Sequence, residues 1–316
     1  MKILVTGATG FIGSALIKYL SNLPEFSVVG MVRSIKDISY SSCVEFRLGE
    51  IGSENKSTMN LSDIDVIIHT AGRAHVMNDN SANPIDEFRR VNTYGTLDLA
   101  RLAAEAGVKR FIFLSSIKVN GESTFIGSPF SIDSIEDPRD AYGVSKYEAE
   151  IGLRKMSLET ALEVTVIRPP LVYGPGVKGN FSTLIKLLSL RSPLPFASVI
   201  NNRRSIVGID NLLSMIATCV RHPKAAHQTF LISDNDDLST SHLLMLLGAC
   251  IGKPAVLFKF PVVILNLIAK LFFLKAKAQR IMGTLQVDIS RTCSHLDWEP
   301  PFSVEQGMKK LRQKNK

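Results

Sequence analysis

The residues with the clearest capacity for chemistry are Tyr142 and Lys146, which lie four positions apart in the stretch 141–146. On a helix this spacing places both side chains on one face, so the ammonium would lie close to the phenol. A nearby positive charge favours phenolate and lowers a tyrosine pKa from its ordinary value of about 10. The pair therefore predicts a proton-transfer centre, because a tyrosine with a lowered pKa can act as a general acid or base.

A serine pair stands where such a centre would need a further polar group. The apolar run 111–114 predicts a buried strand that ends at Ser115 and Ser116. Ligands of open α/β sheets bind at the carboxyl ends of strands. We therefore expect Ser116 to hold a substrate hydroxyl or carbonyl beside Tyr142, although simple capping of the strand end would explain a serine pair alone.

The N-terminal stretch predicts a dinucleotide site. An apolar strand at 2–6 runs into a glycine-rich turn, and helical apolar spacing follows at 14–20. Such glycines permit a tight turn, close approach of backbone N–H groups to a pyrophosphate and close packing of helix on strand. The residues expected at the cofactor from this turn are Gly7, Gly10, Phe11, Ile12 and Gly13.

Two later strand ends bear on the choice of cofactor. The strand 26–32 is followed by Arg33, and an arginine there can pair with a 2′-phosphate, whereas an acidic residue would accept hydrogen bonds from a ribose 2′-hydroxyl. We therefore expect NADP(H) to be favoured, with NAD(H) as the alternative. After the strand 44–48, Glu50 and Ile51 are expected near the adenine.

Small residues and an asparagine complete the expected cofactor site. The apolar strand that starts at Val66 runs into Thr70, Ala71 and Gly72, which lets the chain pass close to a cofactor at Ala71. Asn92 lies near the start of a long predicted helix. His69 is expected to be a structural residue at the strand end.

Composition narrows the class of protein. The chain has 316 residues, a formal net charge of +8 and an isoelectric point near 9.3, which suggests an anionic partner such as a phosphorylated ligand, nucleic acid or lipid. A basic helix with interleaved aromatics is missing from the sequence, so nucleic acid is not expected. Four dispersed cysteines fit neither a metal site nor a disulfide framework, and the N-terminus lacks a signal peptide pattern, so a cytoplasmic location is expected.

Several motifs in a fixed order give the chain a family resemblance. Besides the glycine turn, Ser116, Tyr142 and Lys146, they are Asn92, the segments 166–169 and 172–175, Arg204 ahead of 210–212, and Trp298 before Pro300. The sequence resembles the extended short-chain dehydrogenase/reductase family of nucleotide-sugar epimerases, reductases and dehydratases. The resemblance implies an α/β fold, a Rossmann-type doubly wound parallel sheet with a smaller C-terminal substrate lobe. The expected domains are 1–167 for the dinucleotide and 168–316 mainly for the substrate, with some segments returning to the first.

The resemblance also implies roles for these residues. Tyr142 would exchange a proton with the sugar oxygen, Lys146 would lower its pKa and hold the nicotinamide ribose, and Ser116 would hydrogen-bond the reacting oxygen. Arg204 would grip the diphosphate of a UDP-sugar, and Asn180 is a second candidate contact for the nucleotide.

The direction of the reaction stays open between two enzymes. The segments 115–121 and 168–178 look like a bacterial subgroup of polysaccharide and O-antigen pathways, similar to reductases of UDP-4-keto-6-deoxy-N-acetylhexosamine. Arg33 favours NADPH and hence reduction at C4, while 4-epimerases of UDP-N-acetylglucosamine or UDP-glucose share the same catalytic residues. Family dehydratases carry a threonine followed by Asp-Glu where this chain has Ser116-Ile117-Lys118, so dehydration is not expected. A non-catalytic dinucleotide sensor is the alternative of another class, and it should have lost Tyr142, Lys146 or Ser116.

The apolar stretch 261–277 allows three interpretations. Its apolar residues cover nearly every face of a predicted helix that is too short to span a bilayer, which takes about 20 residues. It would be a buried helix of the substrate lobe, a subunit contact in a homodimer, or an interfacial helix in peripheral contact with a membrane.

Overall fold

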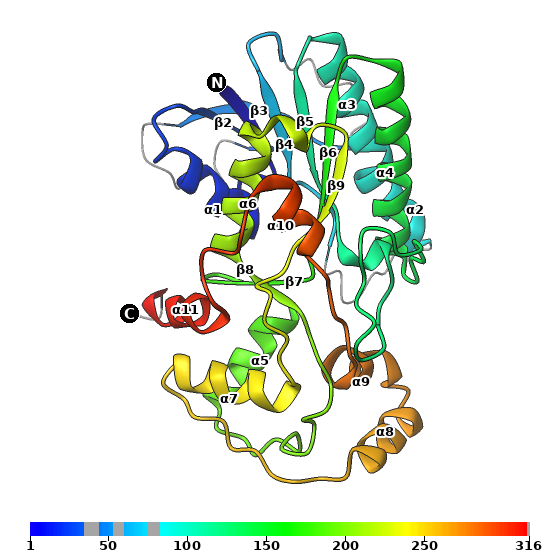
Figure 1. Cartoon of the computed structure of the whole chain (residues 1–316), viewed down its shortest axis with the longest axis vertical. Coiled ribbons are helices and arrows are strands. Elements are labelled where there is room, and N and C mark those ends of the chain that lie inside the picture. The colour runs from blue at the N-terminus through cyan, green and yellow to red at the C-terminus, as the bar shows by residue number, and fades with distance from the viewer. Residues whose placement is uncertain (35–43, 53–59, 75–82, 178, 315–316) are drawn as a thin grey trace.

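The computed structural model describes residues 1–34, 44–52, 60–74, 83–177 and 179–314. Seven parallel strands form one sheet in the order β3-β2-β1-β4-β5-β6-β9, and β7 pairs with β8 in a separate parallel ribbon (Figure 1). The strands are β1 (Lys2–Thr6), β2 (Ser27–Val32), β3 (Glu45–Leu48), β4 (Val66–His69), β5 (Arg110–Leu114), β6 (Glu163–Arg168), β7 (Leu171–Tyr173), β8 (Ile206–Gly208) and β9 (Gln228–Leu231). The expected doubly wound α/β fold is therefore confirmed.

Helices connect the strands and build the second lobe. The α-helices are α1 (Phe11–Leu20), α2 (Pro84–Phe88), α3 (Gly95–Glu105), α4 (Ala141–Glu159), α5 (Asn180–Ser189), α6 (Ile209–Arg221), α7 (Thr240–Cys250), α8 (Val262–Leu271), α9 (Lys275–Met282), α10 (Ser290–Leu296) and α11 (Val304–Lys309). Shorter turns are the π-helical Arg89–Tyr94 and the 3₁₀ turns Ile117–Val119, Pro223–Ala225 and Lys310–Lys314.

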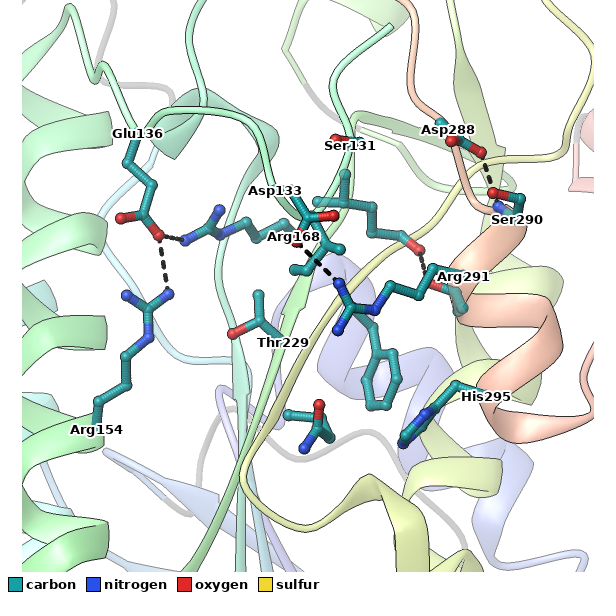
Figure 2. A pocket seen from close by; sticks show the side chains of 15 residues that line it. Ser131, Asp133, Glu136, Arg154, Arg168, Thr229, Asp288, Ser290, Arg291 and His295 are labelled. Atoms are coloured by element: carbon teal, nitrogen blue, oxygen red, sulfur yellow. Dashed lines mark hydrogen bonds and ion pairs between the residues drawn. The ribbon is translucent and has the colours of Figure 1, made fainter.

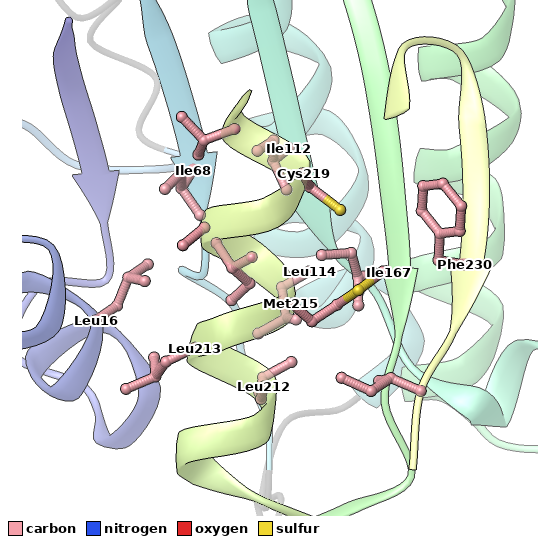
Figure 3. Close-up of a cluster of buried hydrophobic side chains, with 14 of the residues drawn as sticks. Leu16, Ile68, Ile112, Leu114, Ile167, Leu212, Leu213, Met215, Cys219 and Phe230 are labelled. Atoms are coloured by element: carbon pink, nitrogen blue, oxygen red, sulfur yellow. The ribbon is translucent and has the colours of Figure 1, made fainter. Parts of the chain in front are cut away.

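Alternation along the buried strands directs their side chains into two apolar layers. Ile3 and Val5 of β1 point into the layer that α1 and α6 cover, whereas Leu4 points into the layer covered by α3 and α4. Figure 3 shows α6 lying across the sheet, with Cys219 near Ile112 of β5 and Met215 near Leu114 of β5 and Ile167 of β6. The sheet is thus buried on both faces, which explains its nearly continuous apolar strands.

The second lobe has its own small core. Tyr173 at the end of β7 packs with Phe181 of α5, Leu243 of α7 and Val304 of α11. Its hydroxyl donates a hydrogen bond of 2.7 Å to a carboxylate oxygen of Asp234. The segments after residue 168 therefore divide between the two lobes, because β9, α6 and α10 pack on the sheet while α5, α7 and α11 build the lobe.

The apolar stretch near residue 265 is not the buried helix that was one of its interpretations. In α8 only Ala269 is buried, and most of its large apolar side chains are exposed. That interpretation is wrong because the lobe core forms from α5, α7 and α11, while α8 lies at the periphery of the lobe (Figure 1). Within the described residues, no helix is both long and apolar enough to cross a membrane.

Candidate functional site

The expected cofactor residues gather where the strand order reverses. β1 lies between β2 and β4, and the chain leaves β1 and β4 in opposite directions around the sheet. Open α/β sheets bind ligands at the carboxyl ends of strands at such a point. The turn after β1 meets the turn after β4 there: Ala71 donates its backbone N–H to Thr6 Oγ1 at 3.2 Å, and Thr70 Oγ1 donates to the carbonyl of Thr6 at 2.6 Å.

The glycine turn is tight enough to exclude side chains. Gly7 has a φ of +68°, and a Cβ there would lie 2.8 Å from the backbone nitrogen of Ala71. A Cβ at Gly13 would lie 2.1 Å from the carbonyl oxygen of Gly7. Gly10 precedes the first residue of α1 and offers no side chain to cap the first N–H groups of the helix. These residues fit a dinucleotide pyrophosphate.

Tyr142, Ser116 and Lys146 come together at the end of β5. Tyr142 and Lys146 lie one turn apart on α4, and the Tyr142 hydroxyl hydrogen-bonds Ser116. Lys146 is buried, donates a hydrogen bond of 3.0 Å to the carbonyl of Leu114, and lies 4.4 Å from the ring centroid of Phe113. The three side chains therefore share the carboxyl-end edge of the sheet with the loop after β4.

The pKa of Tyr142 is shifted in the opposite direction from that expected from the sequence. Burial and the carboxylate of Asp140 raise the pKa of Tyr142 to about 12, and the hydrogen bond with Ser116 opposes them. The expected lowering by Lys146 is wrong for the protein without cofactor, because removal from water disfavours phenolate and Asp140 lies nearby. Burial also lowers the pKa of Lys146 to about 8, against the opposing charge of Glu150.

Asn92 positions α4, the helix that carries Tyr142 and Lys146. It lies in the π-helical turn directly before α3, and its side chain is buried. Its amide donates to Ser145 Oγ at 3.0 Å and to the carbonyl of Arg73 at 3.1 Å, while its Oδ1 accepts from the Arg73 N–H at 2.8 Å. Asn92 thus ties α4 to the loop after β4, and a Cβ at Gly72 would lie 3.2 Å from Asn92 Oδ1 and 3.3 Å from Lys146 Nζ.

His69 is a structural residue within a directional chain of hydrogen bonds. Thr6 Oγ1 accepts from the Ala71 N–H and lies 2.8 Å from His69 Nδ1, and His69 Nε2 lies 3.0 Å from Thr96 Oγ1. Thr96 in turn donates to the carbonyl of Asn92 at 2.7 Å. Burial, with a smaller effect of Lys146, lowers the pKa of His69 to about 3. A neutral ring with its proton on Nε2 satisfies every partner.

Two groups of positioning residues were not anticipated from the sequence. Asp140 caps α4, since its Oδ1 accepts the Gly143 N–H at 2.8 Å, and it also pairs with Lys118. Aspartate directly before a helix is a recognised start signal that would have identified it. Beneath Ser115, the buried Glu150 accepts from its hydroxyl at 2.5 Å and from Arg168 Nη2 at 2.5 Å. Periodicity carries no signal for such a long-range ion pair.

The remaining predicted residues are spread around this centre. Arg33 and Glu50 are exposed directly after β2 and just beyond β3, and Ile51 is partly buried. Arg204 donates to the carbonyl of Gly283 at 3.1 Å, beside the end of α9, and burial lowers its pKa to about 10. Asn180 is the first residue of α5. The roles of all five residues in binding stay predictions.

A cavity of about 440 Å³ opens beside the edge strand β9, lined by the loop 131–136 and by α10 (Figure 2). Its charged side chains are engaged with each other: Glu136 accepts from Arg154 at 2.9 Å and from Arg168 at 2.5 Å, and Arg291 pairs with Asp133 at 2.9 Å. The cavity thus borders the ion pairs that support β6 and lies outside the expected catalytic centre.

Comparison with known proteins gives the family. The model of the NAD dependent epimerase/dehydratase family matches residues 3–233. The chain belongs to this family. The matched segment contains the glycine turn, Ser116, Tyr142 and Lys146.

Curated relatives extend the likeness over nearly the whole chain. A Vibrio cholerae protein named UDP-glucose 4-epimerase is 44% identical over 312 residues, covering 99% of this chain and 94% of the relative. An Escherichia coli O157:H7 protein named N-acetyl-alpha-D-glucosaminyl-diphospho-ditrans,octacis-undecaprenol 4-epimerase is 22% identical, covering 99% of this chain and 94% of the relative.

Solved structures show the same fold. A UDP-glucose 4-epimerase from Thermotoga maritima with UDP-glucose has a TM-score of 0.79 at 23% identity, covering 100% of this chain and 98% of that chain. A UDP-glucuronic acid 4-epimerase from Bacillus cereus in complex with NAD has a TM-score of 0.79 at 23% identity, covering 99% and 98%. The family is NAD dependent, so the preference for NADP(H) expected from Arg33 finds no support.

Proposed function

We propose that the protein is a UDP-sugar 4-epimerase that uses NAD, with UDP-glucose as the first substrate to test. The observation that carries this proposal is the 44% identity, over 99% of the chain, to the Vibrio cholerae protein named UDP-glucose 4-epimerase. The grouping of Ser116, Tyr142 and Lys146 at the sheet edge supports it. Reduction of a UDP-4-keto-6-deoxy-N-acetylhexosamine has less support, because it depended on the NADP(H) preference inferred from Arg33.

Each residue of the centre has a part in this reaction. The glycine turn after β1 would hold NAD, which when bound would supply reversible hydride transfer at C4 of the sugar. Tyr142 accepts the proton of the 4-hydroxyl during oxidation and gives it back during reduction, so neither protons nor electrons are consumed overall. Ser116 holds the same oxygen through a second hydrogen bond. Lys146 has three N–H donors, of which the carbonyl of Leu114 takes one.

The high pKa of Tyr142 makes this chemistry depend on the cofactor. Without cofactor, burial and Asp140 keep the phenol protonated. The positive charge of an oxidised nicotinamide would favour phenolate, in the same direction as Lys146. Tyr142 would therefore become a base only when the cofactor is ready to accept hydride.

The deciding experiment separates epimerase from reductase. Purified protein is incubated with UDP-glucose, and in parallel with UDP-N-acetylglucosamine, without added cofactor, and the products are followed by NMR. Interconversion at C4 without net change of nicotinamide absorbance is the expected result. In a third reaction the protein receives a UDP-4-keto-6-deoxy-N-acetylhexosamine with NADH or NADPH; stoichiometric loss of reduced cofactor there, with no epimerisation in the other two, would identify a reductase.

A matched variant ties the activity to the proposed centre. Tyr142→Phe should lower turnover at least about a thousandfold while NAD binding changes little, because only the proton-transfer group is removed. Epimerisation at a near wild-type rate in this variant would exclude Tyr142 from proton transfer.

A further inference from the structure

The segment 255–287 carries an exposed apolar surface in the second lobe. We call the apolar face of α8 and the turn that follows it, residues 262–274, the α8 surface. Among its members, Val263 is 79% exposed, Leu271 67%, Phe272 69% and Phe273 95%. Further exposed apolar side chains of this surface are Ile264, Leu267, Ile268 and Leu274. Contiguous apolar exposure of this kind marks a binding surface.

The backbone at Phe273, one of the exposed aromatic residues, is in a strained conformation. Phe273 has a φ of +56°, a left-handed conformation that bulky residues rarely adopt. The turn places its side chain almost wholly in water, where it gains little from burial within this chain. A strained residue that holds an aromatic ring outward points to a partner outside the chain.

Charge identifies the kind of partner. From residue 238 to 287 the chain has no aspartate or glutamate, but it has six lysines and arginines, so this stretch carries +6 of the total charge of +8. Lys259, Lys270 and Arg280 are exposed among them. Apolar side chains in a stretch whose own charges are all positive match an anionic lipid surface, whose headgroups attract lysine and arginine while the acyl region accepts the apolar face.

From these observations we infer that the α8 surface docks the protein on an anionic lipid bilayer as a peripheral, non-spanning contact. α8 has ten residues, about half the length needed to span the hydrocarbon core, so it would lie in the interface plane. The contact reaches towards the catalytic centre: Arg280 of α9 lies 3.9 Å from the Asp140 carboxylate that caps α4. Docking would therefore hold the sugar-binding lobe at the membrane surface.

The test measures vesicle binding of the full chain. Wild-type protein should sediment with vesicles of phosphatidylcholine and phosphatidylglycerol, and far less with phosphatidylcholine alone, and salt should weaken the binding. The combined variant Leu271→Gln, Phe272→Gln and Phe273→Asn should bind at least about tenfold more weakly, because it removes apolar contact while keeping every charge. Asparagine tolerates the left-handed backbone at position 273.

Controls separate the contact from other causes of binding. Leu158→Gln removes an 88% exposed leucine of α4 and should leave vesicle binding unchanged. Lys259→Glu with Lys270→Glu should reduce binding to phosphatidylglycerol vesicles. In Phe272→Trp the emission should shift to the blue on vesicle addition, against the constant signal of the buried single tryptophan Trp298.

Three results would overturn the inference. Absence of wild-type sedimentation with phosphatidylglycerol vesicles is the first. The second is a combined variant that binds as tightly as wild type, which would leave only adsorption of a basic protein. The third is a wild-type dimer that becomes monomeric in the combined variant without vesicle binding in either, which would make the α8 surface a contact between two copies of the chain.

Discussion

At the scale of single residues, the surroundings of Tyr142 disfavour its phenolate form. Its hydroxyl hydrogen-bonds Ser116, but burial and Asp140 raise its pKa to about 12. Lys146 is itself removed from water, and its pKa falls to about 8, so its cation weakens as the pH rises through that value. The protonation states of the centre are therefore set by burial before any ligand arrives.

We predict that oxidised cofactor shifts the titration of Tyr142. In an alkaline titration followed by tyrosinate absorbance, NAD⁺ should move one ionisation to lower pH, and NADH should move it much less, because only the oxidised ring carries the positive charge. Tyr142→Phe should lack the shifted ionisation. Equal titration curves with NAD⁺ and NADH would show that the cofactor charge does not reach the phenol.

The positions of the proposed catalytic residues could be predicted from the sequence, but their electrostatics could not. Spacing on a helix and position at a strand end place Tyr142, Lys146 and Ser116 correctly. The pKa of Tyr142 depends on burial and on Asp140, which are products of packing between distant segments. The ion pair between Glu150 and Arg168 was not predicted for the same reason, because a pair between a helix and a strand leaves no periodic pattern in the sequence.

At the scale of elements, the turn between β1 and α1 tolerates substitution very unevenly. Gly13→Ala should destabilise the fold by about 3 kcal/mol or more and abolish NAD binding, because its Cβ would lie 2.1 Å from the Gly7 carbonyl oxygen. Gly10→Ala is the matched control, since its Cβ would lie 3.1 Å from the same atom. Thermal unfolding should show a much smaller loss for Gly10→Ala; equal losses would contradict the contact.

The hydrogen-bond chain through His69 should make stability depend on pH. The pKa of His69 is about 3 in the folded protein and about 6.5 in an unfolded chain, so the unfolded state binds the extra proton between these values. The free energy of unfolding should therefore be fully present above pH 6.5 and fall as the pH decreases, by at most about 1.4 kcal/mol per pH unit from this group.

Urea denaturation at several pH values from about 7 to about 5 would measure this dependence, because that range brackets the ordinary histidine pKa. The His69→Gln variant should be less stable at neutral pH, because a glutamine side chain fits less well between the hydroxyls of Thr6 and Thr96. Its free energy of unfolding should, however, vary less with pH. An unchanged slope in the variant would exclude His69 as the titrating group.

Elements were predictable where their pattern was local. The predicted strands at 2–6, 26–32 and 44–48 lie within about one residue of the bounds of β1, β2 and β3. The sequence analysis did not predict α6, although most of its residues are buried. The role of this helix in covering the sheet becomes visible only from the residues that it packs against. A helix was expected where α8 lies. Its exposure could not be predicted, because it follows from a lobe core that is formed by other helices.

At the scale of the whole molecule, the chain after residue 168 completes the sheet as well as the lobe. α6 covers the face formed by β4, β5 and β6, and β9 pairs with β6 through contacts such as Arg168 with Leu231. The division of binding roles between 1–167 and 168–316 stays a prediction. As a structural unit, the segment 1–167 is incomplete, because α6 and β9 from the later segment help to bury its sheet.

We therefore predict that a fragment of residues 1–167 does not fold alone. It would leave Ile68, Ile112 and Leu114 without the side chains of α6, and β6 without its neighbour. Such exposed apolar surface favours aggregation. Co-expression with the fragment 168–316 should restore soluble protein; a soluble 1–167 fragment with cooperative thermal unfolding would contradict the prediction.

One carboxylate joins the two lobes to the chemistry. Asp140 caps α4, raises the pKa of Tyr142 and faces Arg280 of α9. If α9 moved away, less of the Asp140 charge would be balanced, and Tyr142 would become a still weaker acid. The acidity of Tyr142 thus depends on the position of α9, and with α9 displaced the proposed proton-transfer group would be less ready to ionise before any sugar is bound.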